Sequence, residues 1–221
     1  MRRRARGWVW ARRSSDAPTR LASSTIPTLT FPCWSGCCGS GRTAIAQPPR
    51  KVAQAFADRL NDVLNRTVTD ARLTLIPIPG HDTQFSIACV EPDTKWSITS
   101  FALHGSHVRL EISHAVEVVD GREHTVSYAY RLSDGDKKDD WLIRWEHTRH
   151  PPKDSYPYPL SHVHVRGECA KLHIPTSRVP LELVLWHAIV EWDVTPKTDD
   201  WRSILEASLA DFYQRRSAPA R

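Results

Sequence analysis

Apolar residues recur at helical spacing in residues 51–67, at the start of the patterned part of the chain. One face of a helix over this segment would carry five apolar side chains, at Val52, Phe56, Leu60, Val63 and Leu64. Charged and amide residues occupy most positions between them. The pattern predicts an amphipathic helix with one face packed on a core.

Strand-like patterns replace the helical spacing between residues 70 and 175. Runs of alternating or continuous apolar residues are separated by turn signals, such as Pro-Gly at 79–80 and Asp-Gly at 120–121. Because the connections are short, successive strands are expected to pair antiparallel.

Two of these runs alternate clearly between faces. In the first, one face would carry Val126, Tyr128, Tyr130 and Leu132. In the second, one face would carry Trp141, Ile143 and Trp145, and the other Leu142, Arg144 and Glu146. The second run therefore presents an Arg-x-Glu pair on one face of the sheet.

Residues 180–216 return to helical spacing in two segments. The first follows Pro180, a residue suited to a helix start, and its stripe comprises Leu181, Val184, Leu185, Ala188 and Trp192. Leu183, Trp186 and Ile189 widen this stripe, so the helix is expected to be buried on most sides. The second segment would face inward with Trp201, Ile204, Leu205, Ser208 and Phe212. The pattern predicts an α+β fold: an N-terminal helix, an antiparallel sheet of six to eight strands, and a C-terminal two-helix pair packed on it.

Residues 1–50 show no such periodicity, and they carry the basic charge of the protein. The chain of 221 residues has a formal net charge of +5. Residues 1–50 hold nine arginines and one acid, whereas residues 51–221 have a net charge of −3. A basic nucleic-acid footprint is therefore not expected on the folded part. We predict a disordered or mis-annotated leader over 1–50 and a single α+β domain over 51–221, strand-rich at 70–175 and helical at 180–216.

Cysteine usage and hydropathy indicate the compartment. The five cysteines are unevenly placed, with Cys33, Cys37 and Cys38 in the leader, and Cys89 and Cys169 in apolar segments. They give no sign of a disulfide framework. No apolar run approaches the length of a membrane helix. The expected location is cytoplasmic, without a membrane partner.

Histidines concentrate in the second half of the chain. Six of the eleven lie between 147 and 187: His147, His150, His162, His164, His173 and His187. On a strand, His162 and His164 would point to the same face about 7 Å apart. With Glu168 they form His-x-His-x3-Glu, the first part of a cupin-type pattern, although no matching second motif follows. One hypothesis is therefore a divalent transition metal bound by His162, His164 and Glu168.

A second hypothesis needs no cofactor. Two imidazoles near physiological pKa can act as an acid–base pair, as RNA cleavage requires. Arg144 or Arg166 could stabilise the developing phosphorane charge, and Tyr158 could be presented beside the histidines by its proline-rich loop. A third hypothesis assigns these histidines a structural role only. The protein would then be a non-catalytic interaction module that binds through its C-terminal helices.

The order "YAYRL … LIRWEHTRHPP … YPLSHVHV" resembles the TumE-type toxins of bacterial toxin–antitoxin modules, over about residues 124–166. The positions that match that pattern are Tyr130, Arg144, Glu146 (where Asp is usual), His147 or His150, His162 and His164. The chain departs from the pattern at Trp145-Glu146, in a longer strand region before the motif, and in its C-terminal helices.

The resemblance implies a bacterial growth inhibitor that is neutralised by an antitoxin protein and acts on RNA. The acid–base hypothesis then becomes a metal-independent ribonuclease. Its catalytic residues would be Arg144, Glu146, His162, His164 and His150. Its substrate contacts would come from Arg166, Tyr130 and Tyr158.

Overall fold

In a computed structural model the described residues are 47–91, 97–135, 140–149, 158–167 and 170–217. Contacts divide the chain into residues 1–43 and 44–221, and every described residue belongs to the second unit. The predictions for residues 1–46 of the leader, and for His150, Glu168 and Cys169, lie outside the described residues, whereas Pro49 and Arg50 at the end of the predicted leader belong to the first helix. Along the chain the elements are α1 (Pro49–Thr67), β1 (Thr74–Pro77), β2 (Gln84–Ala88), β3 (Ser100–Ala102), β4 (Val108–Val119), β5 (Arg122–Asp134), β6 (Trp141–Thr148), β7 (Ser161–Val165), β8 (Ile174–Pro175), α2 (Leu181–Glu191) and α3 (Trp201–Ser217).

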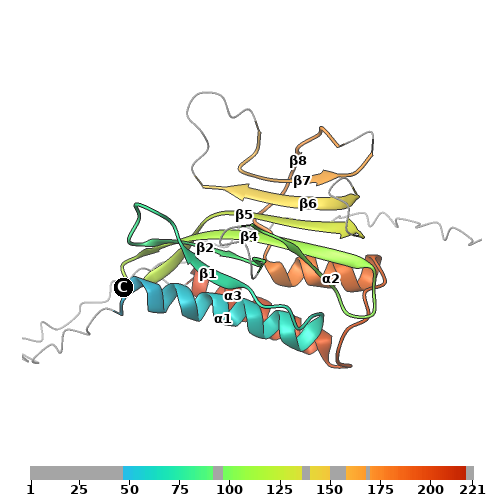
Figure 1. The fold of residues 1–221 in the computed structure, drawn as a ribbon, viewed down its shortest axis with the longest axis horizontal. Coiled ribbons are helices and arrows are strands. Elements are labelled where there is room, and N and C mark those ends of the chain that lie inside the picture. The colour runs from blue at the N-terminus through green and yellow to red at the C-terminus, as the bar shows by residue number, and fades with distance from the viewer. Residues whose placement is uncertain (1–46, 92–96, 136–139, 150–157, 168–169, 218–221) are drawn as a thin grey trace, which may run out of the picture. The chain divides into compact units, whose positions relative to one another are not determined.

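The eight strands form one antiparallel sheet, as the short connections predicted. The strand order is β1-β2-β4-β5-β6-β7-β8, and β3 pairs with β4 alongside β2. Helix α3 packs against both α1 and α2, while α1 contacts β1, β2, β4 and β5, and α2 contacts β5. The helices therefore form one layer under the first part of the sheet, and β6 to β8 extend beyond it (Figure 1). This arrangement confirms the predicted α+β fold.

The core lies between the helix layer and the inner face of β4 and β5. Along β4 the side chains alternate regularly between buried and half-buried. Tyr130 and Leu132 of β5 are fully buried opposite Ile112 and Leu110, as the alternation predicted. The opposite, outer face of the same strands carries polar residues such as Glu111 and Arg131, and no helix of the described residues covers it.

Helix α1 buries the predicted face. Val52, Leu60, Val63 and Leu64 are buried and Phe56 is partly buried against the core. Asn61 joins this face because its side-chain amide donates to the carbonyl of Leu73 and accepts from the Leu73 amide. These two bonds satisfy a buried polar side chain and attach the helix to the segment that leads into β1.

Helix α2 is less buried than its apolar pattern predicted. Leu181, Val184, Leu185 and Ala188 are buried, but Leu183 is 40% and Val190 47% exposed. The prediction that it is buried on most sides holds only in part: Trp186 and Ile189 pack partly buried against the core, whereas the side with Leu183 and Val190 is exposed. No helix of the described residues is long and apolar enough to cross a membrane.

The predicted face of Trp141 was also wrong. Leu132 pairs with Ile143, whereas Ser133 pairs with Trp141, so Leu142 is the extra residue of a β-bulge. The bulge moves Trp141 out of the row of Ile143 and Trp145. Its ring centroid lies 6.0 Å from the guanidinium carbon of Arg144 on the outer face.

Candidate functional site

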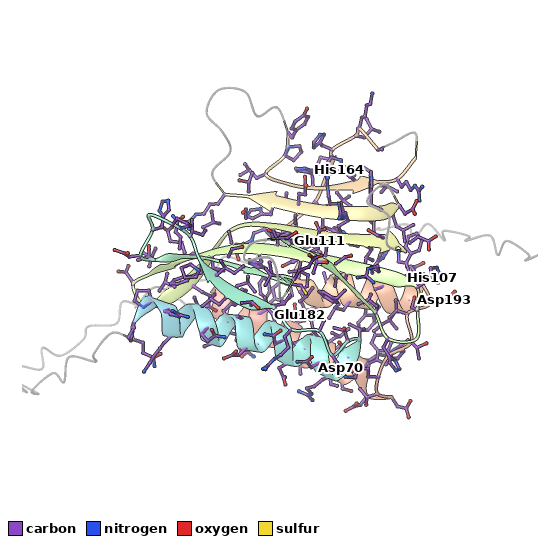
Figure 2. All side chains as sticks on the ribbon, viewed as in Figure 1. Asp70, His107, Glu111, His164, Glu182 and Asp193 are labelled. Atoms are coloured by element: carbon purple, nitrogen blue, oxygen red, sulfur yellow. The ribbon has the colours of Figure 1, made fainter. Side chains whose placement is uncertain are left out.

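Pairing of β6 with β7 brings four of the predicted residues onto one face of the sheet. Arg144 is the cross-strand partner of His164, and Glu146 is the partner of His162. Between them, Trp145 and Val163 point to the opposite face, where the Trp145 ring meets His187 edge-on at 5.4 Å. Arg144, Glu146, His162 and His164, four of the residues named by the catalytic hypothesis, therefore share one face. His164 lies on β7, well away from the helix layer (Figure 2).

Backbone carbonyls orient both imidazoles of this face. His162 is 1% exposed, and its Nδ1 lies 2.8 Å from the carbonyl oxygen of Pro159. His164 is 3% exposed, and its Nδ1 lies 3.3 Å from the carbonyl oxygen of Ala170. A carbonyl oxygen can only accept, so each Nδ1 carries the hydrogen, and the neutral form of each ring has its lone pair on Nε2.

These two lone pairs converge on one carboxylate oxygen. His162 Nε2 lies 3.1 Å and His164 Nε2 lies 3.4 Å from Glu146 Oε2. The other oxygen, Oε1, lies 2.9 Å from Arg144 Nε. In the neutral form of both rings, three electron-pair donors face one another here, an arrangement that a cation bound between them would stabilise.

A third imidazole comes from the residue that precedes β8. The potential ligand atoms of His162, His164 and His173 all lie within 4.8 Å of one another. Within the described residues, the buried Nδ1 of His173 has no hydrogen-bond partner. Tyr158 stacks on the His173 ring, with 3.5 Å between ring centroids, and orients it. We call His162, His164, His173 and Glu146 the histidine cluster.

The electrostatics of His173 favour a neutral ring. Burial lowers its pKa below the ordinary value, and the neighbouring His164 and His162 act in the same direction. The Glu146 carboxylate opposes this shift in pKa. A neutral ring keeps an electron pair available for a metal ion.

His173 was not among the residues predicted for the site. The strand-like pattern between residues 70 and 175 did not predict which strands pair at its C-terminal end. In the structure His162 pairs with Pro175 and Val163 with Ile174, so the chain returns alongside β7. That return brings His173 back to the His-x-His pair. A hairpin predicted over residues 161–175 would have placed His173 beside His162 and His164.

Other predicted site residues lie elsewhere. Tyr130 is buried on the helix-facing side of the sheet, where its hydroxyl lies 2.9 Å from His114 Nδ1. His147 also occupies that side, stacked on Tyr128 and 2.9 Å from Ser161 Oγ. Alternation of side chains along β5 and β6 separates both from the histidine cluster. Arg166 pairs with Asp140 at 3.4 Å. Tyr158 does join the cluster, through its stacking on His173.

Comparison of the chain with protein-family models, with curated proteins and with solved structures finds no significant match. The resemblance to TumE-type toxins therefore stays a prediction. Any functional conclusion depends on the chemistry of the cluster itself.

Proposed function

We propose that the protein binds a divalent transition metal ion through the imidazoles of His162, His164 and His173, with the carboxylate of Glu146 as a fourth ligand. Imidazole nitrogens and a carboxylate oxygen are ligands typical of zinc, iron, nickel and cobalt. The hypothesis from the sequence named His162, His164 and Glu168 as ligands. The present proposal adds His173 and replaces Glu168 by Glu146.

One observation carries this proposal: backbone carbonyls hold Nδ1 of both His162 and His164, which directs both Nε2 atoms to the same point. Metal-binding histidines usually donate their second ring N–H to a carbonyl or carboxylate, because this selects the tautomer and the ring orientation. Arg144 orients the Glu146 carboxylate in a similar way. Its Nε lies beside Oε1, so Oε2 faces the imidazoles.

The expected chemistry depends on how many ligands the protein supplies. Three imidazoles and one carboxylate would complete a tetrahedral ion, whereas an octahedral ion would keep two further positions. A bound metal ion of this kind acidifies water and polarises substrate oxygens. The residues of the chain hold the ion, and Arg144 is a positioning residue through its contact with Glu146.

Elemental analysis of the full chain, purified without chelator and after loading with Zn²⁺, Fe²⁺, Co²⁺ or Ni²⁺, tests the proposal. We expect about one equivalent of metal to survive desalting, and the double variant H162A/H164A to lose it. The matched control is H81A, which removes an exposed histidine outside the cluster. Absence of bound metal in the folded wild-type chain under all loading conditions would overturn the proposal.

A second candidate is the metal-independent ribonuclease of a toxin–antitoxin pair, acting in the cytoplasm and neutralised by an antitoxin protein. The shared face of Arg144, Glu146, His162 and His164 favours it, because a cation, a carboxylate and two imidazoles are the groups that such cleavage uses. Cleavage of RNA that persists in excess EDTA and disappears in H162A/H164A would support this candidate. Loss of cleavage in EDTA would instead favour the metal site.

A further inference from the structure

The chain around β8 folds back along β7, and we call residues 170–176 the β8 segment. Two residue pairs join β8 to β7. One of the two β8 residues is Pro175, which has no backbone N–H and therefore donates nothing to the ladder. Directly after β8, the Thr176 amide donates to the Ser161 carbonyl at 3.0 Å. Backbone pairing thus attaches the β8 segment to the sheet over a very short length.

The β8 segment also buries little apolar surface. Leu172 is 56% and Ile174 is 41% exposed, and Pro175 is exposed as well. The helix layer lies under the first part of the sheet, so no helix of the described residues packs extensively on β7 or β8 (Figure 1). Segments with few buried apolar contacts and short ladders open locally at a free energy well below that of global unfolding. The interactions of the described residues therefore give the β8 segment a low local stability.

This weakly attached segment covers two of the proposed metal ligands. His162 and His164 are almost fully buried, although they lie on the face of the sheet opposite the helix layer. The His173 ring lies against both, with centroid distances of 4.6 and 4.4 Å. The Ala170 carbonyl oxygen lies 3.3 Å from Nδ1 of His164. Opening of the β8 segment would remove both contacts and give an ion a path to the ligand pair.

We infer that the β8 segment is a metal-dependent clasp, which opens to admit the ion and is held closed over β7 when His173 coordinates it. The inference rests on the proposed metal function. Two of the imidazoles lie on β7 and the third lies on the β8 segment, yet their ligand atoms are all within 4.8 Å of one another. An ion bound by all three would cross-link the segment to the strand. Where ligands come from an element of low stability, the free energy of metal binding also orders that element.

The effect of the ion on stability should be local. The core lies on the other face of the sheet, between the helix layer and the inner face of β4 and β5. Shortly after the β8 segment, the Val179 amide donates to the Tyr128 hydroxyl at 2.6 Å, which attaches the chain to β5 again. Closing of the segment therefore leaves the contacts of the core as they are.

Hydrogen–deuterium exchange of the full chain, with and without saturating Zn²⁺, tests the inference. We expect Zn²⁺ to slow amide exchange in residues 170–176 by about tenfold or more and to leave exchange in β4 and β5 unchanged. H173A should lose the slowing, because an ion on the remaining ligands no longer touches the segment. E146Q is the matched control, since it also removes one ligand but keeps His173, and it should retain the slowing at saturation.

Metal content measured on the same samples separates this test from that of the metal proposal. Bound Zn²⁺ in the wild type with unchanged exchange in residues 170–176 would overturn the clasp and leave the metal proposal standing. Equal slowing in Zn²⁺-loaded H173A and wild type would do the same. If H173A takes up no Zn²⁺, the comparison of wild type with and without Zn²⁺ decides. A folded wild-type chain that binds no Zn²⁺, Fe²⁺, Co²⁺ or Ni²⁺ would overturn both.

Discussion

Glu146 and His162 face each other across β6 and β7, and the carboxylate Oε2 lies 3.1 Å from the imidazole Nε2. The Nδ1 of the same ring is occupied by the Pro159 carbonyl, so the neutral ring can offer the carboxylate only a lone pair. With a neutral ring, two electron-pair donors would lie against each other, and a metal ion between them would stabilise the pair.

Glu146 is expected to contribute directly to metal affinity. Replacing the carboxylate by an amide in E146Q removes the negative charge while keeping the size of the side chain. We expect at least about a tenfold weaker affinity for Zn²⁺, measured by competition with a chromophoric chelator. The control is E117Q, on another outer-face carboxylate that accepts from Gln84. Unchanged affinity in E146Q would limit the ligand set to the three histidines.

His173 is expected to be the third imidazole ligand. The H173A variant should lower the affinity for Co²⁺ and change the visible d–d spectrum of the Co²⁺-loaded protein, because the coordination sphere loses a nitrogen. H81A should leave both unchanged. Identical Co²⁺ spectra in the wild type and H173A would show that this ring is not a ligand.

His114 is expected to make the fold sensitive to acid. It is buried with Nδ1 2.9 Å from the Tyr130 hydroxyl and Nε2 3.1 Å from Thr125 Oγ1. Burial lowers its pKa from 6.5 to about 3, and the nearby Arg178 and His147 act in the same direction.

Between these two pKa values the unfolded chain binds a proton that the folded chain does not. The free energy of unfolding therefore falls as the pH drops below about 6.5, by up to about 1.4 kcal/mol per pH unit from this residue. Urea unfolding at pH 7.5, 6 and 5 should show a smaller pH dependence in H114Q than in wild type. H81Q should retain the wild-type dependence, and an equal dependence in H114Q would contradict the assignment.

Gly105 is expected to be intolerant of any side chain. Its φ is +61°, and a Cβ atom there would lie 2.8 Å from the Cβ and Oγ1 atoms of Thr195. Gly80 has a φ of +80° but nothing within 4 Å of a Cβ, so G80A is the matched control for backbone strain alone. We expect G105A to lower the free energy of unfolding by about 1–3 kcal/mol more than G80A, because close packing adds a clash. Equal losses in urea unfolding would show that Thr195 moves away without cost.

Local patterns in the sequence were sufficient for the elements and for several of their faces. The helical spacing of Val52, Leu60 and Leu64 is the face that α1 buries. Alternation along residues 126–132 placed Tyr128, Tyr130 and Leu132 toward the core. Burial of one side of a helix or strand repeats with the period of the backbone, so neighbouring residues along the chain contain the information.

The same reasoning failed where one residue interrupts the period. The bulge at Leu142 reverses the expected face of Trp141. The exposure of Leu183 and Val190 shows that an apolar pattern does not reveal how many neighbours a helix has. Both outcomes depend on pairing and packing partners that lie far away in the sequence.

The sequence by itself therefore determined the α+β composition, the shared face of His162 and His164, and the shared face of Arg144 and Glu146, because strand side chains repeat every two residues. Only the tertiary structure decided that these two faces coincide, that Arg131 lies opposite Arg144, and that His173 returns to the pair through β8. Strand register and loop closure join residues distant in the chain, and their energies depend on the whole sheet rather than on any local pattern.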